Sequence, residues 1–440
     1  MKRDKIGSRL GFIMMSAGCA IGCGNVWKFP WMVGQNGGGA FVLLYAVFLL
    51  ILGLPVMTME FAMGRASQAS PVKMYQVLTP EKKPWRIHGY LAMLGNICLM
   101  AFYTTVTGWM MYYFFSFLTG NYANLGFAQM ISIPSVNVSY MLITVALAFF
   151  VLTFNLQNGL EKVTKYMLSV LLVLMIVLAA KSVTLPGSSM GYQFYLVPDF
   201  SLITPNVIVS AMNQAFFTLS IGMGSLAIFG SYIDKSRSLM GESLNVILID
   251  SFVAIVAGLI IFPSCASFQL EVTAGPSLLF DTMAVVFQNI SGGRVWGTLF
   301  FLFMIFAAFS TVLAVCENIL ACVRELTGWS RKKGCLICGI GIALISLTTA
   351  LGFSVIPFHP FGEDTVFLDF WDFIVSTNIL PLGAFLFNIY CVNSRFGWGW
   401  DAFIKEANTG RGMKVHSWMR PIFTYFLPAC ILLIYILGII

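Results

Sequence analysis

The sequence predicts an all-α membrane protein of about eleven transmembrane helices, with the first and sixth helices broken at membrane depth. Three observations lead to this prediction. The 440 residues are 58% hydrophobic and only 10% charged, whereas an ordinary soluble domain has about 25% charged residues. Apolar stretches long enough to cross a hydrocarbon core of about 30 Å recur from end to end. Two of these stretches contain glycine clusters that interrupt a helix.

The eleven predicted spans follow one another with short loops between them. Their approximate centres are Ile21, Leu50, Phe102, Ala146, Leu172, Leu219, Ala257, Ala307, Ala343, Ala384 and Leu432. We expect a single transmembrane domain over residues 1–440. Within it, the first five spans occupy 7–180, the next five occupy 205–392, and the last helix occupies 417–440.

The first span carries the more informative break. Its segment 18–30 contains three glycines, the polar Asn25 and the cation Lys28 within an apolar run. Glycine costs about 1 kcal/mol relative to alanine in a helix interior. In lipid, each backbone N–H or C=O that the break frees needs a new partner or a water-lined cavity. Broken backbone at this depth therefore indicates a binding site.

The sixth span contains a matching break around Leu219. Two hydroxyls, of Thr218 and Ser220, and two glycines, Gly222 and Gly224, lie at mid-depth there. Glycine-interrupted spans at corresponding places in two five-span halves are the sequence sign of an inverted-repeat transporter. Close helix packing is the alternative reason for such glycines.

Loop charge predicts the orientation in the membrane. If the N-terminus is cytoplasmic, the inside loops hold all 25 lysines and arginines except Lys28, Lys181 and Arg294, which satisfies the positive-inside rule. An odd number of spans then leaves the C-terminus outside, in a multi-pass protein of the plasma (cell inner) membrane, within the lipid bilayer. The net charge of +7 follows from this bias, and no basic domain for nucleic acid is present.

Five strings in the chain resemble the neurotransmitter:sodium symporters, the family whose bacterial prototype is LeuT. The strings are RLG at 9–11, GCGNVWKFP at 22–30, QNGGGAF at 35–41, PVMTMEFAMG at 55–64 and FFTLS at 216–220. They occur in the family's order and at its spacing, over almost the whole chain. The resemblance implies the LeuT fold, a 5+5 inverted repeat with broken helices 1 and 6, and sodium-coupled amino-acid transport.

The resemblance also implies two bound Na⁺ ions with oxygen ligands. The first sodium site takes a backbone or side-chain oxygen from each of Ala20, Asn25, Thr218 and Asp250. The second takes the carbonyls of Gly18, Ile21 and Ala307 with the hydroxyls of Ser310 and Thr311. The family usually has asparagine where this chain has Asp250. Because a carboxylate supplies the fixed negative charge that chloride supplies in many animal members, we hypothesise chloride-independent transport.

A zwitterionic amino acid would lie between the two breaks, by the same resemblance. The N–H groups of Cys23 and Gly24 and the phenol of Tyr103 would hold its carboxylate. The carbonyls of Ala20, Phe217 and Thr218 and the Ser220 hydroxyl would hold its ammonium group. The pocket for its side chain would be lined by Leu99, Phe217, Met223, Val312 and Val315. These residues carry no charge, so we expect neutral hydrophobic or aromatic L-amino acids as substrates.

The resemblance places one gate on each side of the membrane. On the outside, Lys28 would face Asp369, beneath which Phe217 and Tyr103 would form an aromatic lid. On the inside, Arg3 would approach Glu325 next to Tyr232. Surface ion pairs are worth only about 0–1 kcal/mol, so either pair can open during a transport cycle.

Three functions remain open at this point. A sodium-coupled importer is favoured over a proton-coupled transporter of the same fold, in which Asp250 would exchange a proton. A non-transporting amino-acid receptor or channel is the third. An enzyme is not expected, because no nucleophile, base and orienting group occur together in the sequence. The sequence leaves the particular amino acid and the oligomeric state open, a homo-oligomer included.

Overall fold

A computed structural model describes residues 6–123, 126–272 and 276–439, and helices dominate these residues. The α-helices are α1 (Arg9–Ala20), α2 (Phe29–Gln35), α3 (Gly39–Phe48), α4 (Leu54–Ser67), α5 (Pro71–Leu78), α6 (Arg86–Thr119), α7 (Phe127–Ile131), α8 (Pro134–Thr153), α9 (Lys162–Val183), α10 (Ser188–Leu196), α11 (Pro205–Thr218), α12 (Ser225–Gly230), α13 (Leu239–Ser267), α14 (Met283–Asn289), α15 (Gly293–Thr327), α16 (Arg331–Gly352), α17 (Phe367–Asp372), α18 (Leu380–Val392), α19 (Trp400–Ala407) and α20 (Leu427–Ile439).

Shorter π- and 3₁₀-helices extend or join these α-helices. They are η1 (Gly24–Lys28), η2 (Leu49–Gly53), η3 (Lys83–Trp85), η4 (Gln157–Glu161), η5 (Phe200–Leu202), η6 (Leu278–Thr282), η7 (Phe373–Ile379), η8 (Ser417–Met419) and η9 (Ile422–Phe426). The described residues contain isolated β-bridges but no strand.

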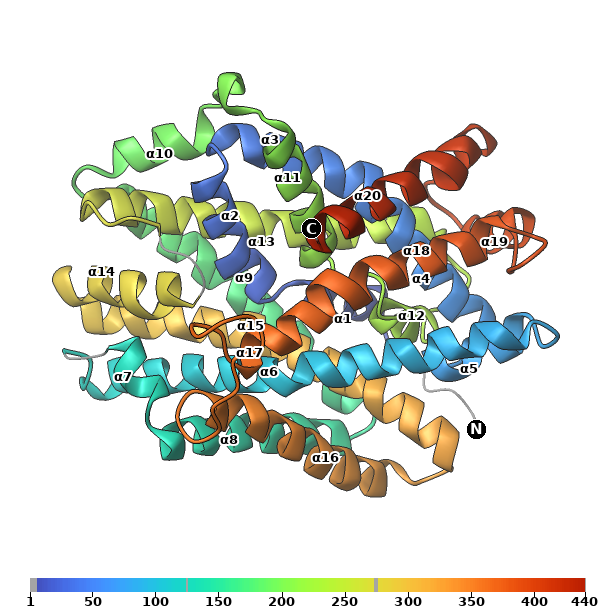
Figure 1. The fold of residues 1–440 in the computed structure, drawn as a ribbon, viewed down its shortest axis with the longest axis horizontal. Helices are drawn as coiled ribbons and strands as arrows, with labels where there is room; N and C mark the ends of the chain where they lie inside the picture. Colours follow the sequence, from blue (N-terminus) through green and yellow to red (C-terminus); the bar gives the residue numbers. More distant parts are fainter. Residues whose placement is uncertain (1–5, 124–125, 273–275, 440) are drawn as a thin grey trace.

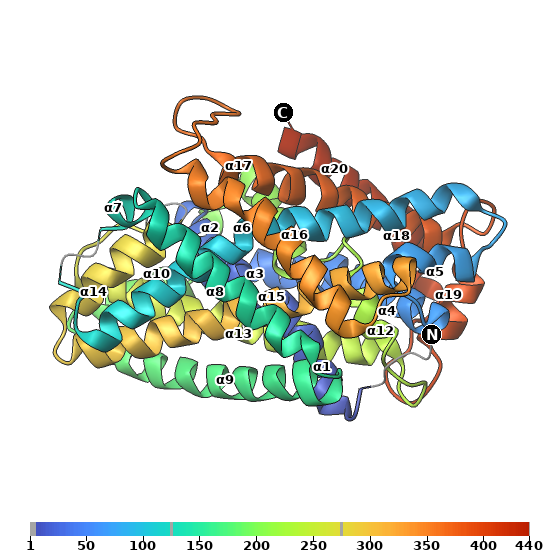
Figure 2. The same ribbon diagram turned by 90° about the horizontal axis from the view of Figure 1, so that it is seen from below.

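The long helices run side by side along the longest axis of the molecule (Figure 1). Helices α7, α10 and α14 lie at one end of this bundle, and α5 and α19 lie at the other, as a second view also shows (Figure 2). Within the described residues, nine helices are long and apolar enough to cross a membrane, and α1 with η1 and α2 forms a tenth, bent span. The predicted span around Leu219 is the pair α11 and α12, each too short to span alone. The all-α prediction is confirmed.

The first break forms where the glycines predicted it. Helix α1 ends at Ala20, Ile21 is extended with φ −66° and ψ 115°, and the chain continues through η1 and α2 at an angle of 57° to α1. The Gly22 N–H that the break frees donates to the Asn25 side-chain oxygen at 3.1 Å. A side chain within the motif therefore satisfies part of the broken backbone, as burial requires.

The second break lies between α11 and α12. Three of its residues, Ser220, Gly222 and Gly224, have left-handed backbone with φ of +50°, +104° and +68°, a region that glycine enters without steric cost. A Cβ on Gly222 would lie 2.1 Å from the Leu380 carbonyl oxygen of α18. The Gly222 N–H donates to the buried Glu60 carboxylate of α4. The break is therefore held by neighbouring helices on two sides.

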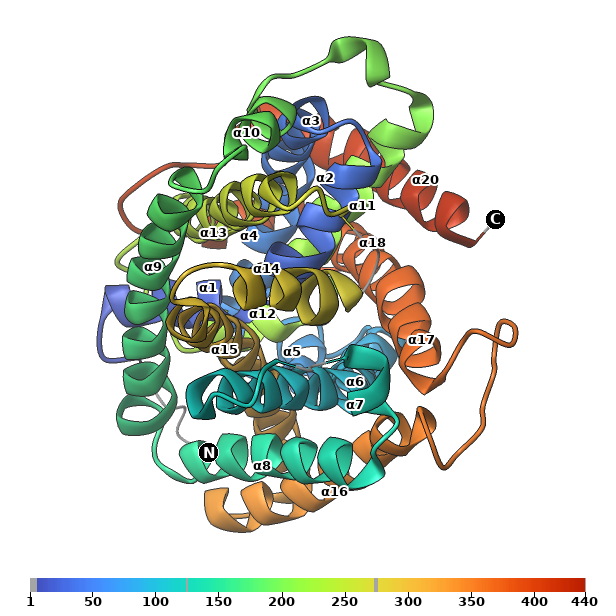
Figure 3. The ribbon, with the colours of Figure 1, turned by 90° about the vertical axis from the view of Figure 1, so that its left-hand side faces the viewer.

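Helices α1 and α12 lie in the middle of the bundle, which is clear when the bundle is viewed along its length (Figure 3). Every residue of α12 and every residue of α1 from Gly11 to Ala20 is buried. Helix α12 also packs closely against α4, since a Cβ on Gly64 would lie 1.9 Å from the Ala227 carbonyl oxygen. Small residues allow such close contact between helices in membranes. The two breaks thus lie side by side in the core.

Candidate functional site

Helix C-termini, with their partial negative charge, and helix N-termini, with their partial positive charge, meet where the two breaks lie. The last carbonyls of a helix have no partner within that helix, and both Ala20 and Thr218 are last residues, of α1 and α11. The free N–H groups lie at the start of η1 and of α12, which begin the second halves of the two broken spans. Helix C-termini favour cations and helix N-termini favour anions. The centre of the protein therefore has partial charges that suit both the ammonium and the carboxylate group of a zwitterion.

A group of buried oxygens surrounds Asp250 of α13, and its polar atoms are only partly satisfied. Asn25 Nδ2 donates to the Asp250 carbonyl at 3.1 Å and to its Oδ1 at 2.9 Å. The Thr218 hydroxyl lies beside both the Asp250 carboxylate and the Tyr45 phenol. Yet Asp250 Oδ2, Thr218 Oγ1 and Tyr45 Oη are buried without a hydrogen-bond partner among the described residues. Buried polar atoms are seldom left unpaired, and these oxygens suit a hard cation such as sodium.

A second group of oxygens lies where α1 meets α15. The Thr311 hydroxyl donates to the Ile21 carbonyl at 2.8 Å and to the Gly18 carbonyl at 3.3 Å. The Ser310 hydroxyl donates to the Ala307 carbonyl at 2.9 Å. The five residues expected at the second sodium site therefore lie together. Each hydroxyl can rotate and present its lone pairs to an ion instead.

Tyr103 of α6 lies between the two groups of oxygens. Its hydroxyl accepts a hydrogen bond of 2.8 Å from the Cys23 N–H, at the N-terminal end of η1 just after the first break. A Cβ on Gly22 would lie 2.1 Å from this hydroxyl and 2.8 Å from Thr311 Oγ1. Only glycine fits at this point, because the phenol and the α15 hydroxyl come so close to the α1 backbone.

A cavity of about 550 Å³ lies between Tyr103 of α6 and Leu368, Asp369 and Asp372 of α17, which all line it. The predicted residues Cys23, Lys28, Tyr103, Phe217 and Asp369 all line it. Its other lining residues are mostly apolar or aromatic, among them Trp27, Trp31, Phe102, Leu380 and Ile434. The predicted pocket residues Leu99, Met223, Val312 and Val315 do not line this cavity and are buried in the core, as are Ala20 and Gly24. Ser220 is half-buried at the second break.

The outer gate differs from the expected ion pair. Lys28 and Asp369 line the same cavity but form no salt bridge with each other. The Lys28 ammonium lies 3.6 Å from the centre of the Phe217 ring, a cation–π contact. Asp369 accepts from the Val366 N–H at the start of α17 at 2.8 Å. Among the described ring contacts, none joins Phe217 to Tyr103, so the expected aromatic lid is not formed here either.

Contacts around the start of α1 join it to distant helices on the side where the inner gate is expected. The Gly7 N–H and the Ser8 hydroxyl donate to the Glu161 carboxylate of η4 at 2.8 and 2.9 Å. Arg9 pairs with the buried Glu242 of α13 at 2.9 Å. Sequence reasoning missed both carboxylates, since each lies more than 150 residues from the residues that it contacts and follows no motif.

The predicted inner-gate residues lie at the same end of the bundle. The Tyr232 hydroxyl donates to Glu317 at 3.0 Å, and Arg331 pairs with the same carboxylate at 2.6 Å. Glu325 accepts from the N–H and the hydroxyl of Ser70 at 3.0 and 2.6 Å. Arg3 lies outside the described residues, so its pairing with Glu325 stays an expectation.

Two further polar residues of the site were also missed. Tyr45 carries a phenol in the middle of the apolar run of α3, where any hydroxyl needs a partner, and that was a usable signal. Gln214 lies one turn before Thr218 on α11 and donates to the Gly24 carbonyl at 2.9 Å. Its side-chain oxygen is buried without a hydrogen bond in the described part of the chain.

Comparison with known proteins places this geometry in a family. The profile of the "Sodium:neurotransmitter symporter family" matches residues 3–132 and 123–440. The sodium-dependent transporter YhdH of Bacillus subtilis (strain 168) is 33% identical over 391 residues, which cover 87% of this chain and 86% of the relative. The chain belongs to the sodium:neurotransmitter symporter family.

Other members of the symporter family extend the likeness. The sodium-dependent serotonin transporter of Drosophila melanogaster is 26% identical over 99% of this chain and 76% of its own. The crystal structure of MhsT in complex with L-phenylalanine superposes with a TM-score of 0.89 and 30% identity, covering 99% of this chain and 100% of that one. The protein is thus a sodium-dependent symporter with the LeuT fold, a multi-pass membrane protein and not an enzyme.

Proposed function

We propose that this symporter imports neutral hydrophobic or aromatic L-amino acids by alternating access across the plasma membrane. The observation that carries the proposal is the meeting of two broken helices beside a mostly apolar cavity whose lining includes Cys23, Tyr103 and Phe217. The free helix ends suit the two charges of a zwitterion, and the core below is lined by uncharged side chains. The likeness to MhsT, crystallised with L-phenylalanine, supports the same substrate class.

Two sodium ions are proposed to travel with each amino acid. The first would lie among the oxygens of Ala20, Asn25, Thr218 and Asp250, and the unpaired Asp250 Oδ2 and Thr218 Oγ1 support this site. The second would lie between α1 and α15 at Ser310 and Thr311. Each charge that crosses 100 mV releases about 2.3 kcal/mol. Two ions with a neutral zwitterion would therefore supply roughly 4.6 kcal/mol, enough for accumulation on the order of a thousandfold.

Substrate binding would change the contacts of three residues at the floor of the cavity. The incoming carboxylate would take over the Cys23 N–H, which now donates to Tyr103, and would accept from the phenol. The substrate ammonium would face the carbonyl end of α11 and the Ser220 hydroxyl. Lys28 would leave the Phe217 ring and approach Asp369, which lines the same cavity. Outer closure would then exclude water from the loaded site.

Chloride is proposed to be dispensable. Asp250 is fully buried and would provide next to the first sodium ion a negative charge that needs no co-transported anion. Sodium-driven uptake should keep the same rate when gluconate replaces chloride on both sides of the membrane. A fall of tenfold or more on this replacement would contradict the proposal.

The arrangement in the membrane is proposed from loop charge. The N-terminus would lie in the cytoplasm and the C-terminus outside, with the five-span repeats at 7–180 and 205–392 and the last helix at 417–440. The close contact of α12 with α4 and of α18 with the second break is compatible with this division. A homo-oligomer is compatible with the fold.

The test is uptake of radiolabelled amino acids into proteoliposomes, with an inward gradient of either sodium or choline. We expect concentrative uptake of phenylalanine, tryptophan, leucine or methionine in sodium only, and none of aspartate, glutamate, lysine or arginine. Unlabelled amino acids added in excess would rank the substrates by competition. Equal uptake in sodium and choline would overturn sodium coupling, and binding without accumulation would favour a receptor or channel.

One observation favours proton coupling as a second candidate. Asp250 Oδ2 has no hydrogen-bond partner among the described residues, so the carboxyl group has room for a proton as well as for an ion. Uptake driven by an inward proton gradient in sodium-free choline medium distinguishes proton coupling from sodium coupling. Accumulation under these conditions would favour the proton, and its absence would favour sodium.

A further inference from the structure

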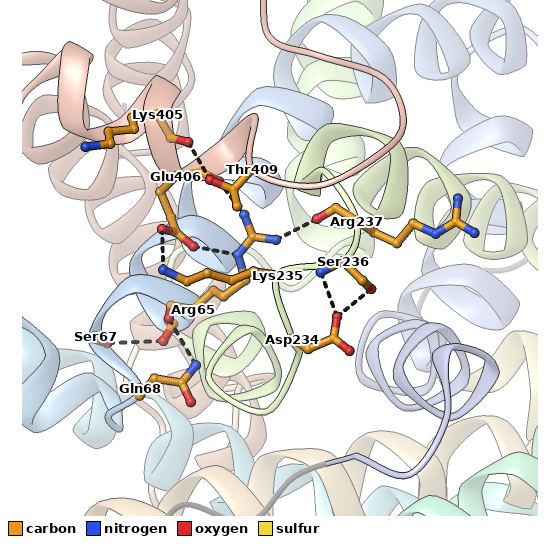
Figure 4. A network of polar contacts seen from close by, with 11 residues as sticks. Arg65, Ser67, Gln68, Asp234, Lys235, Ser236, Arg237, Lys405, Glu406 and Thr409 are labelled. Atoms are coloured by element: carbon orange, nitrogen blue, oxygen red, sulfur yellow. Dashed lines mark hydrogen bonds and ion pairs between the residues drawn. The ribbon is translucent and has the colours of Figure 1, made fainter.

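A buried ion pair lies outside the transport site, at the end of the bundle that holds α5 and α19 (Figure 1). Arg65 in the last turn of α4 is fully buried, and its Nε lies 2.6 Å from Oε1 of Glu406 in α19. The other two guanidinium nitrogens donate to the Arg237 carbonyl, at 2.6 Å, and to the Glu406 carbonyl. Figure 4 shows one guanidinium joining three segments that are far apart in sequence.

The backbone reinforces this junction. Residues 231–238, which follow α12, pair with the chain that follows α19 through two hydrogen bonds of 2.9 Å, from the Arg411 N–H to Ser236 and from the Ser238 N–H to Arg411. A Cβ on Gly410 would lie 2.5 Å from the Arg237 nitrogen. The Lys235 ammonium adds a more exposed contact to Glu406 at 3.3 Å. We call residues 400–412 with residues 234–238 and Arg65 the α19 joint.

The other side of α19 is fixed to α18 and to the last span. The Trp398 N–H donates to the Tyr390 carbonyl at the end of α18 at 2.8 Å. The rings of Trp400 and Phe403 lie 5.4 and 5.9 Å from the ring of Phe423 in η9. Helix α19 is therefore attached on one side to α18 and η9, and on the other to α4 and the chain after α12.

The ends of these attached helices reach both sides of the transport site. Helix α12 is the inner half of the broken sixth span and packs closely on α4 through Gly64 and Gly230. Helices α18 and α20 line the outer cavity with Leu380, Pro381 and Ile434. The α19 joint is thus a continuous connection from the inner half of a broken helix to the wall of the outer cavity.

The burial of the pair indicates whether this connection opens and closes. Separating Arg65 from Glu406 would leave a charge buried without a partner, which is strongly unfavourable. Contacts that switch are better made by exposed pairs, which are worth little. Both side chains of the α19 pair are little exposed, 0% for Arg65 and 10% for Glu406, whereas in the Arg9–Glu242 pair the arginine is 49% exposed and the glutamate 2%.

We propose that the α19 joint stays closed throughout the transport cycle and carries the movement of α4 and α12 to α18 and α20, with Arg65 as its positioning residue. The inference rests on the alternating access proposed above. It assigns to the loop between α18 and α20 a part in linking the inner and outer openings of the pathway. If the Arg65–Glu406 pair served only to stabilise the fold, it would not transmit movement between the helices during transport.

The direct test is to cross-link the α19 joint with a disulfide, called the staple below, so that it cannot open. Arg237 and Arg411 are partners in a β-bridge, a spacing that a disulfide can span. After mild oxidation with copper phenanthroline, the double variant Arg237→Cys/Arg411→Cys should keep its sodium-driven uptake within twofold. Wild type, oxidised in the same way, controls for the ten native cysteines. A loss of tenfold or more on stapling would overturn the proposal, since it would mean that the joint must open.

A staple across a contact that is expected to switch provides the comparison. Ser8 donates to Glu161 in the inner closure. A short bis-methanethiosulfonate linker between Ser8→Cys and Glu161→Cys should stop net uptake. The rate of disulfide formation in Arg237→Cys/Arg411→Cys gives a readout that needs no transport. A fixed joint predicts equal rates in sodium with phenylalanine and in choline, and rates that differ by tenfold would overturn it.

Substitutions of Arg65 test the positioning role. Arg65→Lys and Arg65→Met should lower net uptake about tenfold while phenylalanine binding in sodium stays within twofold. The staple at 237 and 411, added to the same variants, should restore uptake to within threefold of wild type. Lys405→Met, at an exposed cation of α19, is the matched control and should behave as wild type.

The outcomes separate this inference from the proposed function. Variants that bind phenylalanine but are not restored by the staple would overturn the positioning role of Arg65. If the Arg65 variants fail to fold, the staple in the wild-type background still decides whether the joint is fixed. If wild type shows no sodium-driven uptake, the proposed function fails, while the cross-linking rates still report on the joint.

Discussion

Asp250 brings a carboxylate into the middle of the bundle, and its partners explain how it can lie there. Asn25 donates to one carboxylate oxygen, while the other oxygen has no partner among the described residues. A sodium ion at this second oxygen would give both carboxylate oxygens of Asp250 a partner. The charge of Asp250 would therefore tie the proposed sodium binding to the proposed independence of chloride, and both can be tested at a single residue.

Replacing Asp250 by asparagine removes the fixed charge and keeps the shape. We expect Asp250→Asn to lower sodium-driven uptake in gluconate medium about tenfold, or about 1.4 kcal/mol, because the first ion loses its counter-charge. Chloride should restore part of this loss. Asp364→Asn, an exposed acid in the loop before α17, is the control. Equal uptake by Asp250→Asn with and without chloride would contradict the assignment.

The hydroxyls of Ser310 and Thr311 belong to the proposed second sodium site. Each hydrogen-bonds a carbonyl that is expected to bind sodium, and a hydroxyl contact is worth about 1 kcal/mol. Ser310→Ala and Thr311→Ala should each raise the sodium concentration for half-maximal uptake about fivefold, measured in proteoliposomes. Thr298→Ala, on the same helix with its hydroxyl bonded to the Arg294 carbonyl, should leave this concentration unchanged. An unchanged sodium dependence in both site variants would place the second ion elsewhere.

Residues near a motif were predictable from the sequence, and residues brought in by distant helices were not. Asn25 and Thr218 lie in strings whose order and spacing fit the family, and the same resemblance assigned Ser310 and Thr311. Glu161, by contrast, approaches α1 only because α9 folds back beside it. Lys28 was expected to pair with Asp369 but lies over Phe217, since an aromatic face in the open cavity offers a nearer contact to the cation.

At the scale of elements, glycines decide where helices break and where they touch. Both breaks were predicted from glycine clusters, and both form at these clusters, between Ala20 and Gly24 and between Thr218 and Ser225. The exact course of the second break was not predictable, because Ser220 adopts φ +50°, a conformation that few non-glycine residues accept. Contacts with α4 and α18, which are distant in sequence, hold it there.

Two glycines, one in a crowded helix contact and one facing open space, test the role of glycine in close helix packing. A Cβ on Gly64 would lie 1.9 Å from the Ala227 carbonyl oxygen, whereas a Cβ on Gly341 would meet nothing within 4 Å. Gly64→Ala should therefore destabilise the protein by about 1–3 kcal/mol through overpacking. Gly341→Ala, in the interior of α16, should stabilise it by up to about 1 kcal/mol. Thermal unfolding in detergent measures both, and a Gly64→Ala variant as stable as wild type would show that α4 and α12 can separate.

At the scale of the whole molecule, composition was sufficient to predict the class of protein, and loop charge predicts its orientation. The connection of α4, α12, α18 and α20 through α19 was not predictable, since Arg65 and Glu406 are 341 residues apart and each looks like an ordinary cytoplasmic charge. Only the folded chain brings them together. Long-range order of this kind sets the route of movement, while local motifs set the chemistry of the site.

The orientation gives a prediction that needs no transport assay. With an odd number of spans and the positive-inside rule, alkaline phosphatase fused to the C-terminus should be active in a bacterial host, and a green fluorescent protein fused there should be dark. A fusion in the loop at residues 395–420, on the predicted cytoplasmic side, should give the opposite pair of results. A fluorescent C-terminal fusion would reverse the proposed topology.

The most direct test of sodium-coupled transport is the steady accumulation ratio of L-phenylalanine in proteoliposomes. The ratio would be measured at −100 mV inside with equal sodium on both sides, so that voltage is the only driving force, in chloride-free medium. Two sodium ions per substrate predict a ratio on the order of a thousandfold, falling to one when choline replaces sodium. A ratio of one in sodium, or the same accumulation in choline, would contradict the account.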